Sequence, residues 1–151
     1  MEHESARDDF LDRIVAVCRL LEIDPPPDQE GDDIAYQLDI DEVTFLLEHA
    51  ALDRPQSFLV RCPLGKVPPA DREASLAYLL QANASLGHSG GGALCLDQAG
   101  EEVSCVTRIA LAHAEHTVLS TLLDVRDVAR SWGQRFWPST AERTMQDLMR
   151  P

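Results

Sequence analysis

The amino-acid sequence predicts an α+β fold in which helices flank a twisted antiparallel sheet, with the elements in the order α-β-β-β-α-β-β-α. Short segments rich in apolar and β-branched residues occur in neighbouring pairs, and only a tight turn separates the members of a pair. Longer segments show the apolar periodicity of helices. Strands joined by tight turns pair antiparallel, and 151 residues suit one domain.

The first predicted helix begins near Ser5, a candidate N-cap, and has acidic residues in its first turn, where the helix dipole favours them. Its apolar residues form two adjacent stripes, Phe10, Ile14, Val17 and Leu21 in one and Leu11, Val15 and Cys18 in the other. Together the stripes cover an arc of about 160°, which is wider than one core contact needs. Either a second element of the same domain or a partner covers the surplus. Prolines 25–27 end the helix, and residues 29–33 continue as an acidic loop.

Three strands are predicted next. Residues 35–40 and 43–50 form a hairpin, because only Asp41 and Glu42 separate them. The glycine that is usual in such a turn is missing, so the turn type stays open. After a turn at residues 54–56, residues 57–62 are expected to form the third strand, and residues 63–69 a loop.

A second helix and a second hairpin follow. A helix is predicted over residues 71–86, and the glycine-rich residues 87–92 then interrupt the chain. Residues 93–97 and 103–111 form the second hairpin.

A long helix is predicted over residues 114–136. Its buried stripe is expected to consist of Val118, Leu122, Val125, Ala129, Trp132 and Phe136. The predicted domain covers residues 1–137, and residues 138–151 form a C-terminal tail that is either a short helix or disordered.

The net charge of −13 is concentrated at one end of the chain. Residues 1–53 hold sixteen acidic and three basic residues, whereas residues 54–151 hold ten of each. This acidic third would repel nucleic acid and an anionic membrane, so neither is an expected partner. A basic or apolar protein segment would not be repelled, although the charge also fits a role in solubility alone.

The four cysteines, Cys18, Cys62, Cys95 and Cys105, lie among apolar neighbours and form no C-x-x-C pair, which is typical of reduced, buried thiols. No secretory signal and no apolar run of membrane-spanning length is present, so the chain is expected to be cytoplasmic.

Enzyme and metal motifs are weak. Residues 87–91 match G-x-S-x-G around Ser89, and Asp97 with His113 or His116 would complete a triad. The nucleophile elbow, however, requires a turn from strand to helix, whereas this turn leads from helix to strand. The spacing of the histidines and cysteines does not suit a structural zinc site, and no cofactor is expected.

Residues 79–100 are the most informative local sequence. A helix that ends in Leu79-Leu80-Gln81-Ala82-Asn83 is followed by the glycine-rich loop, by the strand Gly92-Ala93-Leu94-Cys95-Leu96-Asp97 and by a glycine turn. This order resembles the class I type III secretion chaperones (Tir chaperone-like family). The resemblance covers residues 8–137 and includes the order of elements. The hairpin without glycine and the proline run depart from the family pattern, and these departures concern loop shapes rather than the fold.

The resemblance implies a homodimer without enzymatic activity in the bacterial cytoplasm. Such a protein binds the N-terminal segment of one or several type III secreted effectors and keeps that segment extended and competent for secretion; the secretion ATPase is a further candidate partner. The resemblance assigns the dimer interface to Leu76, Leu79, Leu80, Asn83, Leu94 and Leu96. The apolar positions expected to face the client are Phe10, Ile14, Val17, Leu38, Ile40, Phe45 and Leu47, each of which also suits an ordinary core.

Two alternatives stay open at the level of sequence. One is a regulatory relative of the same fold that sequesters a transcription regulator or a secretion component. The other is a small serine hydrolase that uses Ser89.

Overall fold

The computed structural model describes residues 2–89 and 92–135. Its elements are α1 (Glu2–Leu20), β1 (Asp33–Ile40), β2 (Val43–Ala50), β3 (Ser57–Lys66), a 3-10 turn (Pro69–Asp71), α2 (Arg72–Ser89), β4 (Ala93–Leu96), β5 (Glu102–Ala110) and α3 (Glu115–Arg135). This order confirms the predicted one. The expected end of the last helix at Phe136 and the tail of residues 138–151 lie outside the described residues.

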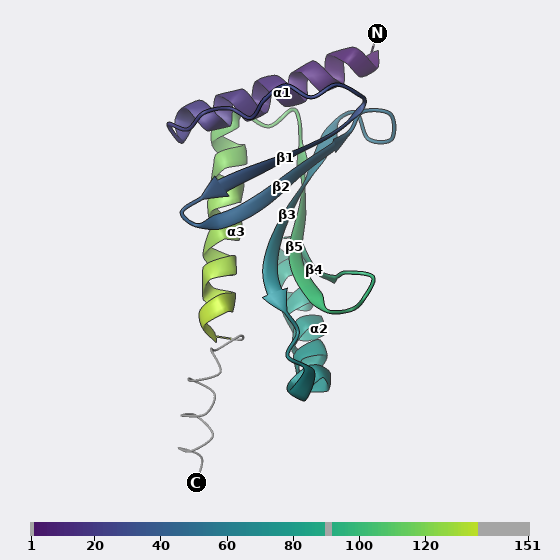
Figure 1. Ribbon diagram of the computed structural model, residues 1–151, viewed down its shortest axis with the longest axis vertical. Coiled ribbons are helices and arrows are strands. Elements are labelled where there is room, and N and C mark those ends of the chain that lie inside the picture. Colours follow the sequence, from purple (N-terminus) through teal and green to yellow (C-terminus); the bar gives the residue numbers. More distant parts are fainter. Residues whose placement is uncertain (1, 90–91, 136–151) are drawn as a thin grey trace.

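The strands form one antiparallel sheet in the order β1-β2-β3-β5-β4. In Figure 1, α3 runs alongside the sheet, α1 lies across one end of both, and α2 lies beside β4. The sheet thus has two outer edges, which belong to β1 and β4. Helix α2 lies against the β4 edge, whereas no strand or helix pairs with the outer edge of β1 among the described residues.

One face of the sheet forms the core with α1 and α3. The alternation along β1 is strict, with Ile34, Tyr36, Leu38 and Ile40 buried and the residues between them exposed. Phe10 of α1 stacks on the His49 ring at 4.9 Å between centroids and lies 5.2 Å from the Phe58 ring. From α3, Val118, Leu122, Val125 and Trp132 are buried in the same cluster, as predicted. Ala129 is half-buried, and Phe136, the last residue of the predicted stripe, lies outside the described residues.

The first hairpin turn forms without glycine. Asp41 and Glu42 both take positive φ angles, 49° and 68°, as a two-residue type I′ turn requires. Helix α3 supports this turn, because Arg126 Nη1 lies 2.6 Å from Asp41 Oδ2 and Arg130 Nη2 donates to the Asp41 carbonyl at 3.0 Å. These contacts offset the cost that a side chain pays in the left-handed region.

Several boundaries differ from the sequence-based expectation. Helix α1 already includes Ser5, which is therefore not its N-cap. Strand β3 continues to Lys66 through a register shift between Pro63 and Gly65, because a bulge tolerates a proline that a regular ladder would not. Helix α2 continues through Gly87 to Ser89, so a single glycine near the end of a helix did not terminate it.

Candidate protein-interaction site

Helix α2 closes the outer edge of β4 with an amide side chain. Asn83 Nδ2 donates to the Leu94 carbonyl at 3.0 Å, and the Leu94 N–H donates to Asn83 Oδ1 at 2.6 Å. A carboxamide offers one donor and one acceptor, so it replaces the pair of hydrogen bonds that a neighbouring strand would make. The free β4 edge is therefore satisfied within the chain at this point.

The six residues assigned to a dimer interface differ in how far their side chains are exposed. Leu79 and Leu94 are buried in the core of the chain, and Leu76 and Asn83 are half-buried. Leu80 and Leu96 are exposed, with 73% and 39% of their surface accessible. Only these two of the six offer substantial apolar surface to a partner.

The seven positions expected to face a client are all buried. Phe10, Ile14, Val17, Leu38, Ile40, Phe45 and Leu47 have at most 5% of their surface exposed. The expectation that these side chains form an outer surface is therefore corrected. The physical reason is that α1 and α3 cover the apolar face of the sheet, so the wide apolar arc of α1 packs within the same domain.

Gln29 occupies the outer edge of β1. Its Nε2 donates to the Ala35 carbonyl at 2.9 Å, and the Ala35 N–H donates to its Oε1 at 3.4 Å. The backbone of Gln29 is held as well, because Arg7 Nη2 of α1 donates to its carbonyl at 2.6 Å and to Asp28 Oδ1 at 3.1 Å. Burial raises the pKa of the neighbouring Tyr36 phenol, and the Gln29 backbone opposes this shift only in part.

No sequence pattern indicates this role of Gln29, which lies in an acidic loop after three prolines. A glutamine in such a loop has no spacing or motif that distinguishes an edge cap from a solvated side chain. The contact depends on where α1 and β1 place the loop in space.

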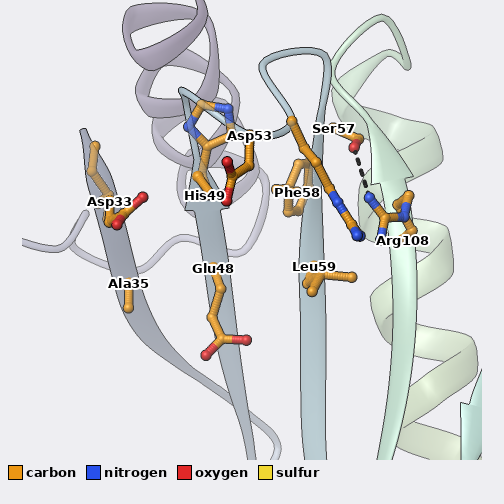
Figure 2. A pocket seen from close by; sticks show the side chains of 12 residues that line it. Asp33, Ala35, Glu48, His49, Asp53, Ser57, Phe58, Leu59 and Arg108 are labelled. Carbon is orange, nitrogen blue, oxygen red and sulfur yellow. Dashed lines mark hydrogen bonds between the residues drawn. The ribbon is translucent and has the colours of Figure 1, made fainter.

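A cavity of about 310 Å³ opens where β2 and β3 separate (Figure 2). The β2–β3 ladder ends at the pair Glu48 and Leu59, and these two side chains form one row across the sheet with Ala35 of β1 and Arg108 of β5. Arg108 Nη1 donates to Ser57 Oγ at 3.4 Å, as the dashed line in Figure 2 shows. The row is acidic on β2, apolar on β3 and basic on β5.

His49 forms part of the lining of this cavity from the core side. Its exposure is 2%, and its Nε2 lies 3.3 Å from the Pro55 carbonyl. Its Nδ1 has no hydrogen-bond partner among the residues that the structure describes. With Nε2 as the donor to Pro55, Nδ1 is an unpaired acceptor; this tautomer is assigned from the hydrogen bond. His49 is therefore a core histidine at the margin of the cavity.

A second hollow lies between α1 and the start of the β5–α3 connection. Asp9, Asp12 and Arg13 of α1 line one side of it. Arg13 is occupied within the chain, because its Nη1 pairs with Glu115 Oε2 at 3.0 Å and its Nη2 donates to the Leu111 carbonyl at 3.2 Å. The two carboxylates are exposed, so this hollow presents an acidic margin to solvent.

The hydrolase alternative lacks a geometric basis. Ser89 ends helix α2, ahead of β4, which is the reverse of a nucleophile elbow. Asp97 accepts hydrogen bonds from the backbone N–H groups of Glu101 and Glu102 at 2.8 and 3.1 Å, and these bonds lower the pKa of Asp97. The carboxylate therefore supports the β4–β5 turn.

No group of three or more histidine, cysteine, aspartate or glutamate side chains is arranged to hold a metal ion within the described residues. Within the same part of the chain, none of the helices has the length and apolar character needed to cross a membrane.

Three of the cysteines are buried thiols, as expected, and Cys95 is half-buried. Cys62 and Cys105 lie directly opposite each other on β3 and β5. Burial raises the pKa of Cys62 to about 12 and that of Cys105 to about 11. These two thiols stay protonated at neutral pH, which makes them poor nucleophiles and poor metal ligands.

The family model of the Tir chaperone protein (CesT) family matches residues 32–126, which contain the whole sheet, α2 and the first half of α3. The chain belongs to this family. None of the curated protein sequences is significantly similar to the chain. Membership of the family agrees with the resemblance carried by residues 79–100.

Two solved structures share the fold. The crystal structure of the ExsC–ExsE complex contains a chain that is 18% identical, with a TM-score of 0.69 over 88% of this chain and 96% of that one. The structure of the HopA1–SchA chaperone–effector complex contains a chain that is 18% identical, with a TM-score of 0.62 over 83% of this chain and 94% of that one. At 18% identity, the similarity to these two structures shows that this chain has the same α+β fold.

Proposed function

We propose that this protein is a bacterial cytoplasmic chaperone that binds the N-terminal segment of one or several type III secreted effectors and keeps it extended. The observation that carries the proposal is the match of the Tir chaperone family model over the sheet and the helices beside it. The similarity to a chain from a chaperone–effector complex is consistent with it. The proposed role is binding without catalysis, and nucleic acid and membranes are not proposed partners.

The proposed binding surface combines the outer edge of β1 with the acidic margin of α1. An extended segment exposes backbone donors and acceptors, which an unpaired edge strand can match. The edge strand carries Asp33 and Asp39, and Asp9 and Asp12 line the hollow beside α1. This charge favours a basic segment and increases its rate of encounter. The seven buried residues contribute by fixing the positions of α1, β1 and β2.

We further propose a homodimer in which α2 and β4 of one copy meet those of the other. Leu80 and Leu96 supply the apolar surface, and Leu76, Leu79, Asn83 and Leu94 support them from beneath. A symmetric dimer uses the same patch on both copies, so each of these side chains would count twice. The secretion ATPase is a further proposed partner, which would receive the loaded dimer.

The test is isolation of the tagged chain from its native bacterium after chemical crosslinking, followed by identification of the crosslinked peptides. The proposal expects crosslinks from α1 and β1 to the N-terminal segment of a secreted protein. A transcription regulator in place of a secreted protein would favour the regulatory alternative. Crosslinks to folded enzymes of metabolism, or to none but the chain itself, would contradict the proposal.

A further inference from the structure

A side-chain amide forms hydrogen bonds with the backbone at each of the two outer edges of the sheet, but the two amides are held differently. At the β4 edge, the amide of Asn83 is half-buried, sits on a helix that packs against the strand, and makes bonds of 2.6 and 3.0 Å. At the β1 edge, the amide of Gln29 comes from an exposed loop and makes longer bonds of 2.9 and 3.4 Å. Opening the first edge requires movement of a helix, whereas opening the second requires only a side-chain rotation.

Gln29 covers only part of the β1 edge. Because backbone groups alternate along a strand, the ladder with β2 leaves the N–H and C=O of Ala35, Gln37 and Asp39 on the outer side. The side chain of Gln29 pairs with both groups of Ala35. Within the part of the chain that the structure describes, the corresponding groups of Gln37 and Asp39 have no strand beside them.

We propose that Gln29 holds the place of a client strand at Ala35, and that an extended basic segment displaces its side chain when it pairs with the β1 edge. The proposal rests on the proposed function, and it adds that the side chain of Gln29 competes with the client for the backbone groups of Ala35. Arg7 holds the backbone of Gln29 through its carbonyl, so the side chain leaves and returns without movement of the whole loop.

The strand that fits this edge has a defined pattern. On the exposed face of the sheet, the side chains of the added strand would lie beside Asp33 and Asp39 of β1. On the buried face, they would lie beside the apolar residues Tyr36 and Leu38. Side chains on a strand alternate between the two faces. The edge therefore selects a segment in which basic and apolar residues alternate, and neither β1 nor β2 contains a lysine or arginine that would repel it.

The probe is a synthetic peptide of alternating lysine and valine, with a glutamate–valine peptide of equal length as its control. Amide hydrogen exchange, measured by NMR on the full chain, reports which β1 amides the peptide protects. The proposal expects the lysine–valine peptide to protect Gln37 and Asp39 in the wild type. The glutamate–valine peptide should leave both amides unprotected.

Gln29→Ala removes the competing amide, and Gln98→Ala is the matched control because Gln98 is an exposed glutamine in the other hairpin turn. Without peptide, Gln29→Ala should accelerate exchange of the Ala35 amide alone. With peptide, it should tighten binding about 3- to 10-fold, which corresponds to about one net hydrogen bond, because the 3.4 Å contact of Gln29 is weak. Gln98→Ala should change neither measurement.

The possible results separate the two claims. Failure of the peptide to protect Gln37 and Asp39 in every variant would overturn the β1 edge as the binding surface, and with it this part of the proposed function. Protection with equal affinity in the wild type and in Gln29→Ala would overturn the role of Gln29 and leave the edge in place.

Discussion

Replacement of Leu80 by glutamate tests the proposed dimer interface. With 73% of its surface exposed, Leu80 contributes little to the fold of the single chain, and surface substitutions change stability by less than about 0.5 kcal/mol. Full burial of a leucine side chain stabilises by about 1.5–3 kcal/mol, so the exposed fraction of Leu80 represents about 1–2 kcal/mol per copy. The symmetry of the dimer doubles this to about 2–4 kcal/mol.

The expected result is a dimer dissociation constant that rises roughly 30- to 700-fold, and further if the two carboxylates are desolvated at the interface. Sedimentation equilibrium over a concentration series measures this constant. Leu52→Glu is the matched control, because Leu52 is 60% exposed in the β2–β3 connection, away from α2. An unchanged dissociation constant for Leu80→Glu, or an equal rise for Leu52→Glu, would refute the assignment of the interface to α2.

Three further predictions concern the chain itself. Glu42→Gly should stabilise the protein by about 1 kcal/mol in urea unfolding, because glycine adopts the φ of 68° without strain; an unchanged or lower midpoint would show that the turn carries no such strain. Asn83→Ala should cost about 2 kcal/mol and speed exchange of the Leu94 amide, and retained protection of that amide would show that α2 closes the β4 edge without the carboxamide. Burial raises the pKa of Cys62 to about 12 and that of Cys105 to about 11, whereas the unfolded thiols have a pKa of 9.0. The free energy of unfolding should therefore fall as the pH rises above 9.0, because the thiols of the unfolded chain ionise first. Cys62→Ala and Cys105→Ala should reduce this fall, and a fall equal to that of the wild type in both variants would assign it to other groups.

The order of the elements could be predicted from local sequence because each element carries its own signal. The Asp41-Glu42 turn is short enough to define a hairpin whatever residues it contains, and the structure shows how Arg126 and Arg130 compensate for the missing glycine. The apolar stripe of α3 was equally clear, because its period of 3.6 residues repeats through several turns.

The candidate site was less predictable because periodicity shows that a side chain avoids water, not which neighbour covers it. The spacing of Phe10 and Phe45 in the sequence fits a client-facing surface as well as a core. Only the packing of α1 on the sheet shows that both side chains belong to the core. Leu80 and Leu79 are adjacent in the sequence, yet one is exposed and the other buried. The role of Gln29 arises from a contact between a loop and the edge of a strand. No pattern in a single sequence predicts such a contact.

The most direct test of the central claim is a quantitative comparison of the proteins secreted by the native bacterium with and without this chain, with cytoplasmic levels measured in parallel. The account predicts that one or a few type III effectors disappear from the medium, and that a copy of the gene restores them. Unchanged secretion of every effector in cells that lack the chain would contradict it.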